Sequence, residues 1–157
     1  MLRPILTSLG ICAAAALLET LCAGTDVEQR FRELRLPVYS LPLWGWFVVG
    51  GLYYLMCFVV LYRILRQEPS TRQRLTCLLL VVALMLANAL WNLVFFRLDQ
   101  LFLAFGVMLP YLVLASSLFA VLRRVDRVSS WFVVPYLAYL VYVTAWAYGV
   151  WRLNTVL

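Results

Sequence analysis

The sequence predicts an all-α membrane protein, a five transmembrane helix bundle that forms a single domain over residues 1–157. Of its 157 residues, 66% are apolar and 13% are charged, whereas soluble domains are about half apolar and about a quarter charged. Five apolar runs follow one another along the chain, each roughly 20 residues long and therefore able to cross a bilayer as a helix. The basic residues lie in short clusters between these runs.

The charge pattern does not predict a nucleic-acid partner. The net charge of +6 comes from 13 arginines, which are spread between the apolar runs as the positive-inside rule and anionic lipid headgroups require. The chain has no histidine, and its four cysteines show no CxxC pairing. Because the usual zinc and haem ligands are missing, we expect no metal site and no bound cofactor. The cysteines are interpreted as small buried apolar residues: Cys12, Cys22, Cys57 and Cys77.

The first predicted helix covers residues 5–23. A secretory signal peptide is disfavoured, because Glu19 interrupts the apolar run and no cleavage site follows it cleanly. We expect Glu19 to lie near the helix end, close to water. Ser8, Cys12 and Ala16 form a ridge of small residues that lets another helix approach closely. This ridge is either an internal contact or the face of a homodimer.

The connection over residues 24–42 is the longest in the chain. Residues 26–36 of this connection carry charges of both signs and are expected to form one or two helical turns on the membrane surface. A connection of this length is either a lid or a plain linker. The second helix, residues 43–65, has Trp46 near its start and Tyr54 further on. Gly50 and Gly51 thin it, either for close packing or to leave space for a ligand.

The third helix, residues 75–96, carries a pair of amides inside a membrane run. Asn88 and Asn92 are four residues apart and therefore share a face, which Trp91 and Phe95 continue. Polar side chains are costly in lipid, so this face is expected to point into the bundle. The amides serve either hydrogen bonds between helices or a polar patch in an aromatic pocket. We favour the pocket because the amides lie among rings.

The fourth and fifth helices are expected over residues 101–122 and 131–152. Pro110 is expected to bend the fourth helix, and Ser129 or Ser130 is expected to cap the fifth. The fifth helix carries more Tyr and Trp than a membrane span needs, although such residues also gather at membrane interfaces and in bundle cores. At helical spacing, one stripe of this helix forms an aromatic wall: Pro135, Tyr139, Tyr142, Trp146 and Gly149.

Arginine counts predict the orientation. Five spans place the termini on opposite sides, and eight of the arginines then lie on the side of the N-terminus. The other five are Arg30, Arg32, Arg35, Arg97 and Arg152. The positive-inside rule therefore favours an N-terminus in the cytoplasm.

Two blocks of sequence resemble the TspO/MBR family, the translocator proteins or tryptophan-rich sensory proteins. They are NALWNLVFF at 88–96, with Gln100 just beyond, and PYLA at 135–138 followed by YxxWRxN at 148–154. Their order and separation match the family, and the resemblance extends from about residue 37 onward. It implies a five-helix bundle, often dimeric, in a membrane that we expect to be a bacterial cell membrane. The family's pocket opens near the long first loop and binds porphyrins, and cholesterol is a ligand of eukaryotic members.

Motif position implies where the pocket residues lie. Asn88 and Trp91 would line it from the third helix, and Tyr139 and Val143 from the fifth. The complete expected set of ligand-binding residues is Asn88, Trp91, Phe95, Tyr139, Tyr142, Val143, Trp146 and Tyr54. A loose sterol-contact pattern is also present, and its alternative explanation is a snorkelling arginine beside an interfacial tyrosine. That pattern consists of Val143, Tyr148 and Arg152.

The chain departs from the family at three positions. Tyr139 stands where members usually have Trp, valines 48 and 49 fall where the second helix usually has Trp, and Val107 falls where the fourth often has an acidic residue. Some bacterial members are described as degrading porphyrin in light through these tryptophans. A tyrosine still stacks on a flat macrocycle, but a valine cannot replace a redox-active indole. The departures therefore favour binding over catalysis.

The favoured function is a membrane binding or sensory protein for a flat hydrophobic ligand, a tetrapyrrole or a sterol. Arginines near the pocket mouth would meet porphyrin propionates. One alternative is a light-dependent porphyrin-degrading enzyme, which is disfavoured because no Ser-His or Cys-His system, metal cluster or phosphate loop is present and no catalytic residue is assigned. The other is a small transporter of such ligands, for which Glu19 is the only candidate coupling charge.

Overall fold

The computed structural model describes residues 2–67 and 72–155, and all regular structure in them is helical. Among these residues, five helices are long and apolar enough to span a membrane. The fold class is therefore confirmed as an all-α five-helix membrane bundle, and the chain is an integral, multi-pass membrane protein. The elements are α1 (Leu2–Ala23), α2 (Val27–Glu33), α3 (Leu43–Leu65), α4 (Arg72–Asn92) with its π-helical extension η1 (Leu93–Arg97), α5 (Leu101–Val125) and α6 (Arg127–Asn154).

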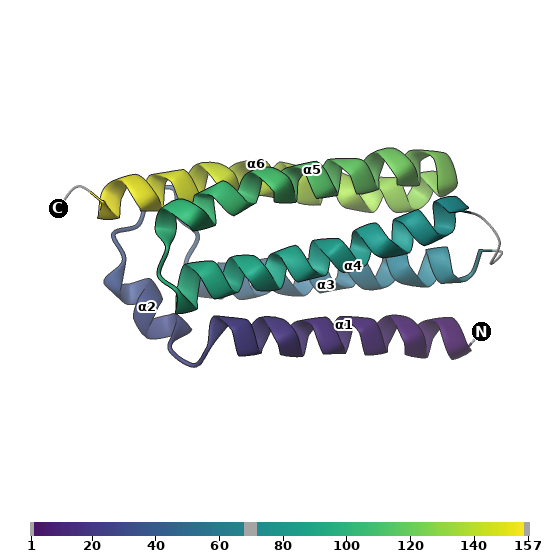
Figure 1. Ribbon diagram of the computed structural model, residues 1–157, viewed down its shortest axis with the longest axis horizontal. Helices are drawn as coiled ribbons and strands as arrows, with labels where there is room; N and C mark the ends of the chain where they lie inside the picture. Colours follow the sequence, from purple (N-terminus) through teal and green to yellow (C-terminus); the bar gives the residue numbers. More distant parts are fainter. Residues whose placement is uncertain (1, 68–71, 156–157) are drawn as a thin grey trace.

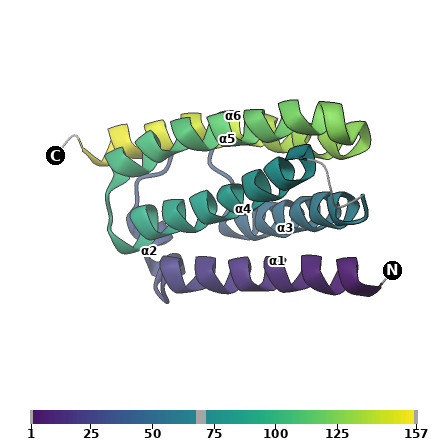
Figure 2. The ribbon, with the colours of Figure 1, turned by 45° about the vertical axis from the view of Figure 1, so that its right-hand side comes forward.

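The spanning helices lie side by side in three layers, with α5 and α6 on one side, α3 and α4 in the middle and α1 on the other side (Figures 1 and 2). The described ends of the chain lie at opposite ends of the bundle. The short helix α2 closes the end of the bundle where α6 finishes. It has the two turns expected in the first connection, because Val27–Glu33 is seven residues long.

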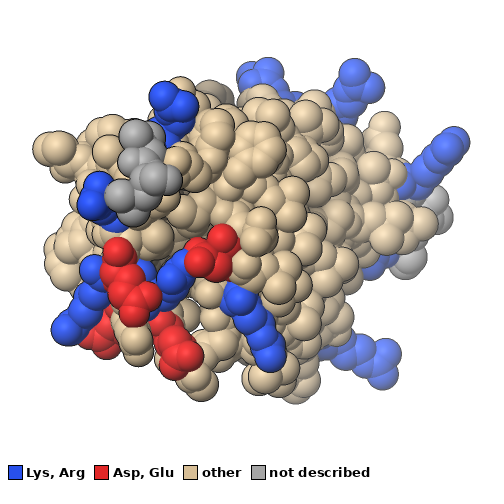
Figure 3. Space-filling model, turned by 60° about the vertical axis from the view of Figure 1, so that its left-hand side comes forward, with Lys and Arg blue, Asp and Glu red and all other residues tan. Residues whose placement is uncertain are grey.

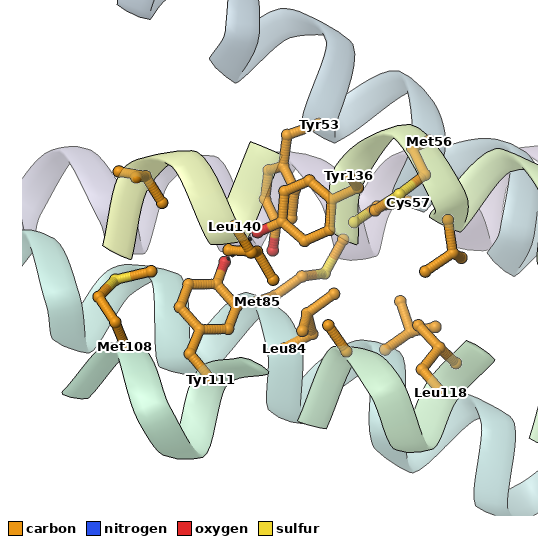
Figure 4. Packing of buried hydrophobic residues seen from close by; sticks show 14 of the residues in the cluster. Tyr53, Met56, Cys57, Leu84, Met85, Met108, Tyr111, Leu118, Tyr136 and Leu140 are labelled. Atoms are coloured by element: carbon orange, nitrogen blue, oxygen red, sulfur yellow. Dashed lines mark hydrogen bonds between the residues drawn. The ribbon is translucent and has the colours of Figure 1, made fainter. Parts of the chain in front are cut away.

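The core is formed mainly where α5 and α6 pack on each other and on α3 and α4. Tyr111 and Tyr136 share a buried hydrogen bond of 2.5 Å between their hydroxyl oxygens, and Tyr53 lies beside them (Figure 4). Large apolar side chains on the outside, such as Leu55 and Val141, are more than half exposed. Such a surface is costly in water and suits contact with lipid tails.

Helix α6 begins earlier than the sequence predicted. Asp126, not Ser129 or Ser130, is its N-cap, and the Asp126 carboxylate accepts a hydrogen bond from the backbone N–H of Val128. Both serines lie inside the helix and are fully buried. The predicted cap was wrong because Asp126 is also fixed by Arg63 of α3, whose Nε lies 2.7 Å from Asp126 Oδ2. The hydrogen bond from Arg63 is the main cause that lowers the pKa of Asp126 to about 2.

The small-residue ridge of α1 faces inward. Ser8 is fully buried and Cys12 is 9% exposed, and α1 packs against α3 and α4. Of the two alternatives for this ridge, the structure shows the internal contact. Gly50 and Gly51 of α3, unlike the ridge of α1, are not in close contact with another helix, because a Cβ atom added at either position would meet nothing within 4 Å. These two glycines therefore leave space and do not serve close helix packing.

At its end, α4 widens into the π-helical turn η1. The backbone N–H of Leu98 donates to the carbonyl oxygen of Leu93 at 2.9 Å, a spacing of five residues. Such π-bulges occur often at functional sites. The turn ends at Arg97, and Asp99, in the tight connection to α5, has a positive φ of 54°.

Candidate functional site

A cavity of about 410 Å³ lies between α1, α3, α4, η1 and α6, beneath α2. This volume is within the range of roughly 300–1,000 Å³ typical of small-molecule sites. Ten of its 21 lining residues are aromatic. They come from every bordering element except α1: Phe31, Trp46, Phe47, Tyr53, Tyr54, Trp91, Phe96, Tyr136, Tyr139 and Trp146.

The aromatic wall is continuous across α3 and α6. The rings of Trp46 and Trp146 have centroids 4.6 Å apart, and Trp46 also contacts Tyr139 edge-on at 6.4 Å. Trp146 is 1% exposed because Phe95 lies behind it, with ring centroids 5.4 Å apart. Rings in such contacts hold one another in place, so the wall is rigid.

The structure brings five of the residues expected at the pocket to the cavity wall: Tyr54, Asn88, Trp91, Tyr139 and Trp146. The other three lie behind it. Phe95 stacks on the back of Trp91 at 4.8 Å, and Val143 is buried in the core at 4% exposure. Tyr142 points toward the first connection, where its hydroxyl donates to the carbonyl oxygen of Tyr39 at 2.9 Å.

The three residues of the sterol-contact pattern do not share one surface. Val143 is buried inside the bundle, whereas Tyr148 is 47% exposed and packs against Phe105 and Trp151. The guanidinium carbon of Arg152 lies 5.9 Å from the centre of the Trp151 ring. Tyr148 and Arg152 thus belong to an outer aromatic patch, and Val143 faces the other way.

Glu19 is a polar residue of the cavity that sequence reasoning missed. It lines the cavity from α1. Its carboxylate accepts hydrogen bonds from the Tyr54 hydroxyl at 2.6 Å and from the Asn92 amide at 3.1 Å. Glu19 was expected near water at the helix end, but its side chain faces the cavity. The signal was present in the ridge, because Glu19 lies three residues beyond Ala16 and seven beyond Cys12 and so shares their inward face.

The cover of the cavity is α2, and the segment that follows it anchors α2 to α6. Phe31 of α2 is 9% exposed and stacks over Trp146, with centroids 6.5 Å apart and ring planes 13° from parallel. The following segment, residues 34–42, is called the strap here. Hydrogen bonds hold the strap to α6: Tyr39 Oη to the Ala145 carbonyl at 3.1 Å, and Trp146 Nε1 to Ser40 Oγ at 2.9 Å.

A second pair of bonds fixes the start of the strap. The side chain of Asn154 accepts from the backbone N–H of Arg35 and donates to the Arg35 carbonyl oxygen, both at 3.0 Å. This side chain thereby satisfies both backbone groups of one strap residue, as a neighbouring β-strand would. The strap is therefore fixed to α6 along several turns.

Charges of both signs gather around α2 (Figure 3). Arg30 forms ion pairs with Glu33 and with Asp99 in the turn before α5, and Arg32 pairs with Glu28 at 2.6 Å. The Arg30–Asp99 pair connects the cover to the turn between η1 and α5. Within residues 2–67 and 72–155, therefore, Arg30 and Arg32 already have carboxylate partners.

Comparisons with known proteins give one family. Curated proteins yield no match to this sequence. A model of the TspO/MBR family matches residues 8–152 of the 157-residue chain. The match includes the cavity-lining residues on α1, α3, α4, η1 and α6, and the cover as well. The chain therefore belongs to the TspO/MBR family of membrane proteins.

Proposed function

We propose that this protein binds a flat hydrophobic ligand, with a tetrapyrrole as the favoured class and a sterol as the alternative, in the cavity beneath α2. The observation that carries this proposal is the cavity of about 410 Å³, in which aromatic side chains surround a few polar groups. Sites of this composition bind small apolar molecules and use the polar groups to orient them. Membership of the TspO/MBR family is consistent with a hydrophobic ligand.

Ring faces favour a planar ligand over a round one. Trp46 and Tyr139 lie in contact along one wall and are partly exposed, and the buried Trp146 supports Trp46 from behind. Trp91, also partly exposed, lines the cavity from α4. A planar conjugated molecule gains stacking contacts with such rings beyond the burial of its area. A sterol, which is flat but not aromatic, would gain the burial without the stacking.

Two cations lie at the α2 end of the bundle, which we take as the mouth of the cavity. Arg35 follows α2, and Arg97 adjoins the lining residue Phe96 and donates to the Leu21 carbonyl oxygen at 3.2 Å. Neither arginine forms an ion pair among the residues that the structure describes. Propionate groups of a tetrapyrrole would extend toward these arginines and away from the aromatic interior. Charge-assisted hydrogen bonds of this kind are strong where water is partly excluded.

A titration with protoporphyrin tests the proposal. Purified protein in lipid nanodiscs is titrated while tryptophan fluorescence is followed, because a bound macrocycle near Trp46, Trp91 and Trp146 should quench it. Tyr139→Ala and Asn88→Ala each remove a group from the cavity wall and should weaken binding by about 1–2 kcal/mol, or roughly five- to thirtyfold.

The matched control is Tyr62→Ala, the same substitution at a tyrosine of α3 that does not line the cavity. Its hydroxyl accepts a hydrogen bond from Arg66 of the same helix. This variant should bind protoporphyrin as the unaltered protein does. Equal affinity in all three variants would place the ligand elsewhere and refute the proposed site.

A further inference from the structure

Glu19 places a carboxylate inside the aromatic cavity. Both of its oxygens accept hydrogen bonds, one from Tyr54 and one from Asn92. These donors are neutral, so they orient the carboxylate without cancelling its charge. No arginine in the described part of the chain forms an ion pair with Glu19. The acids around α2 differ, since Glu28, Glu33 and Asp99 each have an arginine partner.

Glu19 is partly buried, and an uncompensated charge is costly in a partly buried setting lined by aromatic rings. A ligand that brings a positive charge or a strong hydrogen-bond donor to Glu19 would therefore gain more than one that brings an apolar edge. A ligand carboxylate at the same place would meet like charge and lose affinity.

We propose that Glu19 is a specificity-determining residue that selects flat hydrophobic ligands carrying a protonated amine, or another N–H donor, at the corner between α1, α3 and α4. This inference rests on the proposed function, since it assumes that the cavity binds flat hydrophobic molecules. For a tetrapyrrole it means that the propionates face the mouth, because Glu19 repels them from this corner.

Three probes that share one ring system but differ in charge separate the effect of ligand charge on affinity from the effect of ligand shape. They are 9-(aminomethyl)anthracene, 9-methylanthracene and anthracene-9-carboxylate, which are cationic, neutral and anionic near pH 7. Each is titrated into the protein in nanodiscs of zwitterionic lipid, and protein-free discs correct for partition into lipid. The unaltered protein should bind the cation about tenfold more tightly than the neutral probe and the anion more weakly than either.

Glu19→Gln removes the charge and keeps the size of the side chain. It should abolish the preference for the cation while changing the affinity for 9-methylanthracene by less than about threefold, which also shows that the cavity is intact. Tyr54→Phe removes a hydrogen bond to Glu19 but leaves its charge, so the preference should persist. The matched control is Glu28→Gln, an equal change of charge on α2 outside the cavity, which should keep the preference as well.

Equal affinities of the three probes for the unaltered protein, or an unchanged cation preference in Glu19→Gln, would overturn the inference. If Glu19→Gln does not fold, the order of the three affinities in the unaltered protein decides. Failure of the proposed function looks different, because then neither 9-methylanthracene nor protoporphyrin binds to the unaltered protein at all.

Discussion

Tyr39 of the strap and Gly149 of α6 are in direct contact, and no side chain fits between them. A Cβ atom at position 149 would lie 2.7 Å from the Tyr39 hydroxyl oxygen and 2.8 Å from Cγ of Pro37. The tyrosine could swing away, but the proline ring cannot, because it is closed on the backbone. Glycine at 149 is therefore what allows the strap to lie flat on α6.

Gly149→Ala should lift the strap from α6. We expect a loss of about 1–3 kcal/mol in stability, the usual result of overpacking, and weaker binding of protoporphyrin because the cover is displaced. Thermal unfolding in detergent and the fluorescence titration measure the two effects. Gly51→Ala is the control, since its Cβ meets nothing within 4 Å; alanine there should be neutral or slightly stabilising. Equal behaviour of the two variants would contradict the role given to the strap.

Gly50→Leu should block the cavity without unfolding the protein. Gly50 lines the cavity, and its side-chain position is open. A leucine would fill ligand space there, so protoporphyrin affinity should fall by tenfold or more while the unfolding temperature stays within a few degrees. Gly51→Leu adds the same side chain on the exposed side of α3 and should leave binding unchanged. A Gly50→Leu protein that binds normally would show that the ligand does not occupy this cavity.

Asp126→Asn should weaken the junction of α3 and α6. The asparagine can still cap α6, but the ion pair with Arg63 and the hydrogen bond from Ser129 lose their charged acceptor. We expect a loss of about 1–3 kcal/mol, measured as a lower unfolding temperature in detergent. Asp26→Asn is the matched control, because Asp26 is the N-cap of α2 and forms no side-chain cap bond. A similar loss in both variants would argue against the Arg63 pair as the cause.

The same pair predicts a dependence on pH. The pKa of Asp126 is lowered from 3.8 to about 2, mainly by Arg63, so the folded state binds this proton less readily than the unfolded state. The stabilisation is complete above pH 3.8 and is lost as the pH falls toward 2. The difference in unfolding temperature between the unaltered protein and Asp126→Asn should therefore shrink over this interval. A difference that is constant from pH 6 to pH 2.5 would exclude the mechanism.

The N-terminus should lie in the cytoplasm. Eight of the 13 arginines lie at the end of the bundle where α1 begins: Arg3, Arg63, Arg66, Arg72, Arg74, Arg123, Arg124 and Arg127. The side that is richer in Lys and Arg is retained in the cytoplasm, and Asp and Glu contribute little to this rule. Reporter fusions that are active on only one side of the membrane, placed at either end of the chain, measure the orientation. Activity of a cytoplasmic reporter at the C-terminal end alone would show the opposite insertion.

The number and order of the spanning helices could be predicted from the sequence, because every apolar run has the length of a membrane span. Helix ends were harder to predict. Asp126 was not expected to cap α6. It is fixed in the capping position by Arg63, which is 63 residues away in the chain. Local patterns carry no information on such a partner.

The aromatic and amide parts of the cavity were predicted better than its polar corner. Asn88, Trp91 and Tyr139 lie on periodic faces that the sequence displays, and all three line the cavity. Glu19 does so too, and the small-residue ridge of α1 indicates its inward direction. Its partners Tyr54 and Asn92 lie on two other helices, and the sequence pattern of α1 does not indicate them. Phe31 was missed for a similar reason, because a two-turn helix in a polar connection does not indicate which way it folds back.

The strap joins the first connection to the last helix, and this has a consequence for biosynthesis. Its hydrogen bonds to α6 link residues 103 to 119 positions apart. A chain that is made and inserted from its N-terminus exposes the strap long before α6 exists. The cover can therefore close only after the final span has entered the membrane, and no earlier intermediate has a finished pocket. The proposed binding of a ligand would therefore be the property that the nascent chain acquires last.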